Sequence, residues 1–282
     1  MSVHTDVLAW FDDVARDLPW RTDPQPWRVM VSEFMLQQTP VARVLPVFDS
    51  WMDRWPTPGS LAADAPGEAV RAWGRLGYPR RALRLHASAT AIVERHDGQV
   101  PSDIEHLRAL PGVGDYTAAA IASFAFGQRH VVLDTNVRRL FARMVQGAEF
   151  PADSVTVTER QMAADLLPGH DAHRWAAATM ELGAVVCTAK SPRCGACPIE
   201  EHCAWNAAGR PAHAGPPRRG QAYAGTDRQV RGRLLDVLRA SDSPVAKPAL
   251  DAVWDDPDQR ERCLASLLAD GLVHVVDDRY SL

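Results

Sequence analysis

Lysine is nearly missing from this sequence. Of its 31 basic residues only Lys190 and Lys247 are lysines, so the first 189 residues contain none. Chemistry that uses a lysine amine as its nucleophile therefore has no candidate in that part of the chain.

Long apolar runs are also missing. No run approaches the ~18 residues of a membrane helix, and Met1–Trp10 has neither a basic start nor an apolar stretch. We therefore expect no membrane partner and a cytoplasmic, nucleoid-associated location. The net charge of −4 gives no overall positive field. A length of 282 residues with 46% hydrophobic residues predicts a globular chain of roughly two domains.

Cysteine is scarce, but four of the five cysteines lie within one short segment. The lack of a recognisable secretion signal argues against a disulfide framework, and four thiolates suit one four-coordinate metal or an iron–sulfur cluster. The C-x6-C-x2-C-x5-C spacing favours one [4Fe–4S] cluster over zinc or unligated thiols, since zinc ribbons use two short knuckles. The predicted ligands are Cys187, Cys194, Cys197 and Cys203. Cys263 stands alone and is expected to be a small buried hydrophobe.

Residues 1–205 carry helical periodicity almost throughout, with Gly and Pro in the connections. Pro26 opens an apolar helix over 29–38, and Pro40 marks its end. Further helices are predicted near 41–53, 67–75, 79–96, 103–109, 115–126, 135–145, 157–166 and 172–186.

The remainder of the chain divides into a linker and a tail. Residues 206–227 lack periodic hydrophobics and predict a linker, and six arginines against one aspartate lie between Arg210 and Arg233. That charge fits a strap along phosphates or a solvated linker. Residues 228–282 read as three helices, over 228–239, 247–253 and 257–270, and a β-hairpin, which is the order of a winged helix.

The segment from Leu110 to Thr117 holds the Pro-Gly-Val-Gly turn between two helical patterns. Its glycines, Gly112 and Gly114, permit a tight turn whose backbone N–H groups face outward at a helix N-terminus. Together with the small-residue helix that follows, this is a helix–hairpin–helix signature that binds a DNA phosphate without reading bases.

Two carboxylates each leave two readings open. Glu33 lies at helical spacing among Val29, Met30 and Leu36. It is either a structural glutamate paired with an arginine or a general acid whose pKa is raised by desolvation. Asp134 follows an apolar run and precedes a helix start, so it either caps that helix or faces developing positive charge as a buried anion.

Together these motifs resemble the adenine DNA glycosylase (MutY-type) branch of the helix–hairpin–helix, iron–sulfur base-excision superfamily. The resemblance covers about residues 8–205 and includes Arg16–Arg21, the Ser-Glu-x-Met-Leu-Gln-Gln-Thr run, Gly74–Tyr78 and Met180–Gly183. In detail the sequence is similar to the short actinobacterial members. The resemblance implies a mainly α, two-lobed fold with a six-helix barrel and an iron–sulfur lobe, followed here by a small α+β winged-helix-like tail.

The resemblance assigns roles to both carboxylates. It implies that Glu33 protonates a flipped-out adenine at N7, and that Asp134 stabilises the oxocarbenium-like sugar or forms a transient covalent adduct. The resemblance also gives roles to seven other residues. It implies that Tyr116 and Asn136 orient the aspartate, and that Gln38 and Tyr78 wedge into the duplex. The base pocket is implied to be lined by Trp20, Arg21 and Glu181. Without the family, ordinary packing would explain Gln38, Tyr78 and Trp20.

Lysine scarcity then separates two branches of the superfamily. The endonuclease III type cuts the strand through a lysine Schiff base, and the position of that lysine holds Tyr116 here. We therefore expect a monofunctional, water-using glycosylase acting as a monomer on double-stranded DNA with A:8-oxoguanine or A:G mispairs. Lys190 and Arg193 in the cysteine loop are expected to contact DNA. The alternatives are a thymine or oxidised-pyrimidine mismatch glycosylase and a non-catalytic iron–sulfur DNA-binding protein.

The resemblance also sets domain boundaries. Residues 1–22 and 131–205 are predicted to form the iron–sulfur lobe, 23–130 the six-helix lobe, 206–227 the linker and 228–282 the tail. Long members carry a Nudix-like domain that recognises 8-oxoguanine. The residues after Cys203 leave no room for one, so the preference for 8-oxoguanine over guanine stays open.

Overall fold

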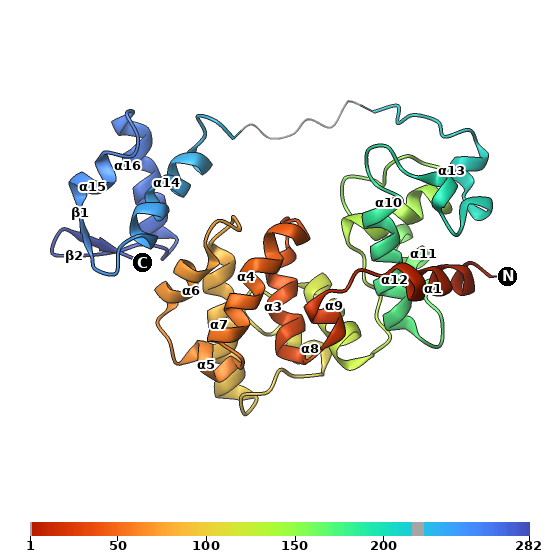
Figure 1. Cartoon of the computed structure of the whole chain (residues 1–282), viewed down its shortest axis with the longest axis horizontal. Helices are drawn as coiled ribbons and strands as arrows, with labels where there is room; N and C mark the ends of the chain where they lie inside the picture. The colour runs from red at the N-terminus through yellow and green to blue at the C-terminus, as the bar shows by residue number, and fades with distance from the viewer. Residues whose placement is uncertain (1, 216–222) are drawn as a thin grey trace. The chain divides into compact units, whose positions relative to one another are not determined.

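The computed structural model describes residues 2–215 and 223–282. The chain is mainly helical, which confirms the predicted fold class, and its strands are confined to the C-terminal region (Figure 1). It divides into two compact units. Unit 1 comprises residues 1–29, 102–108 and 113–217, and unit 2 comprises residues 30–101, 109–112 and 218–282.

Unit 1 holds the N-terminal helices and those on either side of the cysteine segment. Its elements are α1 (Val3–Val14), α2 (Pro19–Thr22), α8 (Ile104–Arg108), α9 (Asp115–Phe126), α10 (Thr135–Met144), α11 (Val157–Asp165), α12 (Ala172–Val185), two 3₁₀ turns, η1 (Cys194–Ala196) and η2 (Glu200–His202), and α13 (Ala204–Ala207). The helix α3 (Pro26–Leu36) begins in this unit and continues into unit 2.

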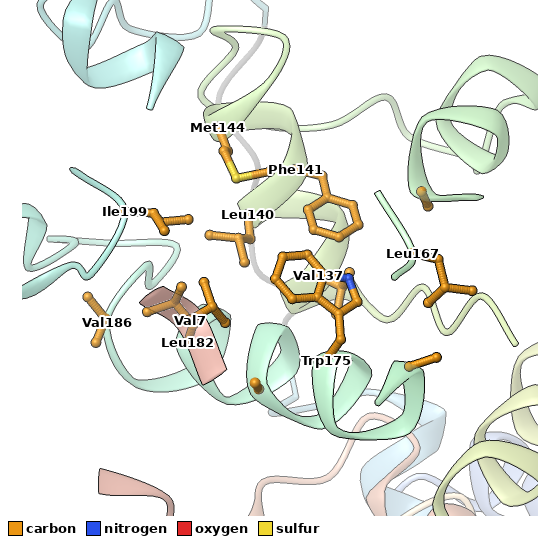
Figure 2. Packing of buried hydrophobic residues seen from close by; sticks show 13 residues of the cluster. Val7, Val137, Leu140, Phe141, Met144, Leu167, Trp175, Leu182, Val186 and Ile199 are labelled. Atoms are coloured by element: carbon orange, nitrogen blue, oxygen red, sulfur yellow. The ribbon is translucent and has the colours of Figure 1, made fainter. Parts of the chain in front are cut away.

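The core of unit 1 forms where α12 packs on α10 and α1. Val137, Leu140, Phe141 and Met144 recur at the spacing of one helix face, so α10 presents a continuous apolar stripe (Figure 2). The ring of Phe141 stacks on that of Trp175 from α12, with centroids 6.4 Å apart. This packing fixes both ends of α10 within the unit.

Unit 2 contains α4 (Val41–Arg54), α5 (Pro58–Ala62), α6 (Pro66–Trp73) and α7 (Arg80–Arg95). Its interior holds three buried tryptophans, and Trp51 meets Trp55 at 4.6 Å and Trp73 at 5.6 Å between ring centroids. Both ring pairs are edge-on, the geometry that aromatic quadrupoles favour.

The tail belongs to unit 2. It contains α14 (Asp227–Arg239), β1 (Val245–Ala246), α15 (Lys247–Asp251), α16 (Pro257–Ala269), β2 (His274–Val276) and β3 (Arg279–Ser281). The strands form an antiparallel sheet of order β1-β3-β2, with Val275 opposite Tyr280. The three predicted helices and the hairpin are confirmed, and β1 adds a third strand. Cys263 is buried, as expected.

The predicted helices between Val29 and Val186 are all present, with ends shifted by a few residues. The first of them ends at Leu36, before the predicted boundary, because the chain turns at Gln37–Thr39. The sequence patterns did not single out α1, α2 and α5. No described helix is long and apolar enough to cross a membrane.

The two units divide the chain differently from the predicted lobes. The helix α9, expected in the six-helix lobe, belongs to unit 1, where Ala120 packs against Val132 and Ala176. The tail, expected to be separate, groups with residues 30–101. Residues 216–222 of the predicted linker lie outside the described residues, as do two arginines of the predicted strap.

Candidate functional site

Asp134 caps the N-terminus of α10. Its Oδ1 accepts hydrogen bonds from the backbone N–H of Asn136 at 2.9 Å and of Val137 at 2.7 Å. The side-chain amide of Asn136 donates to the other oxygen, Oδ2, at 2.7 Å. The capping interpretation is therefore confirmed, and three donors fix this carboxylate in one orientation.

Burial raises the pKa of Asp134 above its ordinary value, although the three donors favour the charged form. The residue as a whole is partly buried. A carboxylate that is fixed and weakly solvated interacts strongly with a nearby cation. The cap is thus confirmed, and the role of an anion that faces developing positive charge stays a prediction.

A hydrogen-bond chain runs from this carboxylate to the cysteine segment. Asn136 Oδ1 accepts from Arg139 Nη2 at 2.9 Å, and the same guanidinium donates to the carbonyl oxygens of Gly183 at 2.6 Å and Cys187 at 2.8 Å. Gly183 is required there, because a Cβ on it would lie 2.7 Å from the backbone oxygen of Asn136. The close packing of α10 on α12 therefore keeps Asn136 and Arg139 in the positions from which they support Asp134.

Glu181 forms a second buried carboxylate site in unit 1. It is completely buried and accepts from Arg16 Nε at 2.5 Å, Arg16 Nη2 at 2.8 Å and Arg21 Nη2 at 2.8 Å. Burial acts to raise its pKa, but the bonds from Arg16 and Arg21 outweigh burial, so the pKa of Glu181 lies below its ordinary value. Trp20, between these two arginines in sequence, is buried. Of the three predicted pocket residues, Arg21 thus contacts Glu181 directly, and Trp20 is the buried chain neighbour of Arg21.

Glu33 lies on α3, and its side chain is only 5% exposed. Ser32, Phe34 and Met35 beside it are also buried, so this helix is enclosed on several sides. The predicted burial of Glu33 is confirmed. Its catalytic role stays a prediction.

Gln38 and Tyr78 share an unusual backbone conformation in unit 2. Their φ angles are +56° and +48°, in the left-handed region that non-glycine residues seldom adopt, and Tyr78 is 46% exposed. Arg81 connects their two loops. Its guanidinium donates to the carbonyl oxygens of Met35 at 2.9 Å and Gly77 at 2.9 Å, and to Thr39 Oγ1 at 2.9 Å.

The Pro-Gly-Val-Gly turn lies between α8 and α9. Gly112 has φ +79°, and a Cβ there would meet Arg84 Cβ at 2.8 Å and Phe34 at 3.1 Å, so only glycine fits. Gly114 is the N-cap of α9 in extended backbone, with nothing within 4 Å of a Cβ. Gly114 thus places free space at the N-terminus of α9, where backbone N–H groups can bind an anion.

The four cysteines line one cavity, together with Arg143, Ile199 and Trp205. Arg143 is fully buried and donates to Cys187 Sγ at 3.3 Å, and Arg139 donates to the carbonyl of Cys187. Burial, together with the charge of the three other cysteines, raises the pKa of Cys197 to about 12. Thiols in such a site ionise only beside compensating cationic charge, so their chemistry fits bound iron.

Among the described residues, no three His, Cys, Asp or Glu side chains converge on a point suited to a single metal ion. All four cysteines line one cavity, as expected if they hold one group together. Lys190 and Arg193, the two cations of this loop, are exposed.

Sequence reasoning missed several arginines that organise these sites, namely Arg16, Arg81, Arg139 and Arg143. The sequence held a general signal for Arg16, because a glutamate on a buried helix face, such as Glu181, needs a cationic partner. The sequence did not indicate which arginine would supply it.

Two family models match the chain. Residues 31–163 match the HhH-GPD superfamily base excision DNA repair protein model, and residues 187–203 match the iron-sulfur binding domain of endonuclease III. The second match begins and ends at the outer two cysteines. The chain therefore has the helix–hairpin–helix base-excision repair fold and binds a [4Fe–4S] cluster, for which the four cysteines stay the predicted ligands.

Proteins with similar sequences narrow the base-excision repair class to one family. The adenine DNA glycosylase of Mycobacterium tuberculosis is 56% identical over 99% of this chain and 92% of that protein. The one from Mycolicibacterium smegmatis is 54% identical over 98% and 94%. The human adenine DNA glycosylase is 42% identical over 70% of this chain and 38% of its own length. This chain belongs to the adenine DNA glycosylase family.

Solved structures agree on the fold. A thermostable thymine-DNA glycosylase is similar, with a TM-score of 0.66, 24% identity and coverage of 73% of this chain and 95% of that one. An endonuclease III–DNA complex gives a TM-score of 0.63 at 23% identity, covering 73% and 94%.

Proposed function

We propose that this protein hydrolyses the N-glycosidic bond of adenine mispaired with 8-oxoguanine or guanine in double-stranded DNA. Adenine as the excised base is supported by the mycobacterial relatives, because their identity of 56% extends over 99% of this chain. The observation that carries the chemistry is the carboxylate of Asp134, which three donors hold in one orientation in a weakly solvated place.

In this proposal the two carboxylates divide the reaction. Glu33 gives a proton to adenine N7, so that the base leaves as a neutral molecule. Asp134 remains ionised and stabilises the positive charge that develops on the sugar, with or without a covalent adduct. The raised pKa of Asp134 reflects its weak solvation, which strengthens its interaction with that charge.

The adenine must leave the base stack to reach these groups. Trp20, Arg21 and Glu181 line the pocket that receives it. Gln38 and Tyr78 enter the duplex at the vacated position, and the exposed ring of Tyr78 on its left-handed turn suits such a wedge. Gly112 and Gly114 bind a phosphate, and Lys190 and Arg193 contact the backbone beside the cluster loop.

Strand cleavage is not part of the proposed reaction. Tyr116 packs against Ala120, Val132 and Ala176 where a lyase would need an amine, and no lysine precedes Lys190. Water is therefore the final nucleophile, and Tyr116 and Asn136 orient Asp134. The bound cluster holds the cysteine loop in place, and the protein acts as a monomer.

Single-turnover base release from duplexes with adenine opposite 8-oxoguanine, guanine or cytosine tests this function. We expect strand breaks only after alkali, fastest opposite 8-oxoguanine, and no covalent complex after borohydride treatment. Breaks without alkali would contradict the monofunctional reaction. Equal rates opposite 8-oxoguanine and guanine would contradict only the preference for the lesion.

Glu33→Gln should abolish adenine release and preserve duplex affinity. Glu94→Gln, on the exposed face of α7, is the matched control and should act as the parent protein does. Release of thymine or an oxidised pyrimidine by the parent, with no release of adenine, would support the alternative glycosylase.

A further inference from the structure

Unit 2 contains a basic groove of about 1110 Å³ between its helical part and the tail. Nine arginines and a single carboxylate, that of Asp236, line it. The chain as a whole carries a charge of −4, so this concentration of positive charge is local. Gln38 and Tyr78 lie on the same lining.

Two separate parts of the chain supply the arginines. One wall comes from residues 37–84 and includes Arg43, Arg75, Arg80 and Arg84. The facing wall is the helix α14 of the tail, with Arg228, Arg231, Arg233 and Arg239. Arg228, Arg231 and Arg233 also belong to the charge cluster that the sequence associated with phosphate binding.

Short-range contacts fix α14 against the helical part of unit 2. Arg71 Nη1 donates to the carbonyl oxygens of Leu238 at 3.1 Å and Arg239 at 2.6 Å. Arg75 pairs with Asp236 at 2.8 Å. A Cβ on Gly67 would meet the backbone oxygen of Leu282 at 2.5 Å, so the end of the tail also packs closely on the helical part.

The carboxylates present neutralise only part of this charge. Asp236 pairs with Arg75 and Arg239, and Asp270 with Arg80 and Arg231. Within the described ranges, none of the exposed Arg43, Arg84, Arg228 and Arg233 forms an ion pair with a carboxylate. Arg228 lies over the ring of Tyr223 at 5.1 Å and Arg233 over that of Trp254 at 5.0 Å, contacts that keep the charge.

We propose that α14 forms one wall of a groove that binds the phosphate backbone of duplex DNA beside Gln38 and Tyr78. This inference rests on the proposed function, because that function places these two side chains in the duplex. Guanidinium groups bind phosphate oxygens through paired hydrogen bonds, so two facing arginine walls suit a phosphate backbone. The tail is then part of the DNA-binding surface.

Salt-dependent binding tests the groove. The parent protein and the double variant R228Q/R233Q would be titrated with a duplex whose target adenosine carries a stabilising 2′-fluorine, at several salt concentrations. Removing one arginine–phosphate interaction should lower the slope of log K against log salt by about 0.9. We expect a slope smaller by about 1–2 and an affinity about tenfold weaker at low salt.

The control is R262Q/R279Q, which removes two exposed arginines of the tail that do not line the groove. It should leave the slope unchanged, and thermal unfolding should show that both variants are folded. An unchanged salt slope in R228Q/R233Q would overturn the proposal. An acidic protein would then be the better candidate for the ligand of the groove. Equally weakened binding in both variants would overturn it too, since that result reflects general charge.

The excision rate at saturating enzyme separates this inference from the proposed function. R262Q/R279Q should keep that rate within about twofold of the parent, because its arginines lie outside both the groove and the reacting groups. A parent protein that releases no adenine would refute the proposed function. The salt slopes would still decide whether DNA occupies the groove.

Discussion

Asn136 donates its side-chain amide to Asp134 at 2.7 Å and accepts a hydrogen bond from Arg139 at 2.9 Å. Arg139 in turn bonds the backbone of Gly183 and Cys187. One amide therefore connects the proposed catalytic carboxylate to the segment that holds the cluster. The orientation of Asp134 depends on how closely α10 and α12 approach.

Replacing Gly183 with alanine tests this dependence. A Cβ there would lie 2.7–2.8 Å from backbone and side-chain atoms of Asn136, so the two helices must separate. Such overpacking costs about 1–3 kcal/mol in the free energy of unfolding, and the excision rate should fall more than duplex affinity. Gly169→Ala, where a Cβ meets nothing within 4 Å, is the control and should change neither quantity. A parent-like excision rate in Gly183→Ala would contradict the link.

The pH profile of base release should report Asp134. Burial raises its pKa, and only the ionised form stabilises the sugar cation, so the rate should fall with decreasing pH at values above the usual ~3.9 of aspartate. Asn136→Ala removes a donor that favours the charged form, and should move this acidic limb to higher pH. The plateau rate should also fall about tenfold, or ~1.4 kcal/mol. An unshifted limb would argue against a positioning role for Asn136.

Arg16→Gln should destabilise unit 1 by about 2 kcal/mol at neutral pH, because it removes charged donors from the buried Glu181. The lowered pKa of Glu181 means that its ion pairs contribute fully above the ordinary value of ~4.3 and are lost as pH falls through the folded-state pKa. The difference from the parent should therefore shrink in acid. Denaturant unfolding at several pH values measures it.

Arg174→Gln is the matched control, since Arg174 and Arg16 are both 38% exposed at the side chain. The partner of Arg174 is the exposed Asp12, so its loss should cost less than about 1 kcal/mol. Equal destabilisation by both variants would refute the special role of burial at Glu181.

Arg81→Gln should loosen the loops that carry Gln38 and Tyr78. Burial lowers the pKa of Arg81 to about 10, so the guanidinium is still charged at neutral pH and bonds acceptors from both loops. We expect a loss of about 3 kcal/mol in stability and weaker binding to mispaired duplex. Arg95→Gln, exposed at the end of the same helix, should match the parent. Arg81→Lys should recover little, because an ammonium cannot reproduce the planar fork.

Arg143→Gln should weaken the hold on the cluster. The buried guanidinium contacts Cys187 Sγ and lies 4.6 Å from the ring of Trp205, so its loss leaves thiolate charge less compensated. We expect the visible iron–thiolate absorption to decay several times faster on mild heating. Arg193→Gln, at an exposed position of the same loop, should decay at the parent rate. Equal decay rates in the two variants would show that Arg143 does not support the cluster.

The sequence by itself determined the elements and the chemistry they could carry. Apolar periodicity gave the helices from Val29 to Val186 and those of the tail, because those patterns are local. The spacing of four cysteines indicated the cluster before any fold was known. A few neighbouring residues placed Glu33 on an apolar helix face and Asp134 at a helix start, and the structure shows the burial and the cap.

Only the tertiary structure decided which side chains meet. Arg16 lies 165 residues from Glu181, and Arg71 lies 167 from Leu238, so no local pattern could pair them. The need for glycine at position 183 arises from a second helix, and the basic groove exists only because α14 folds back on residues far before it. Hydrophobic periodicity specifies which face of a helix is buried, whereas its partner depends on the packing of the whole chain.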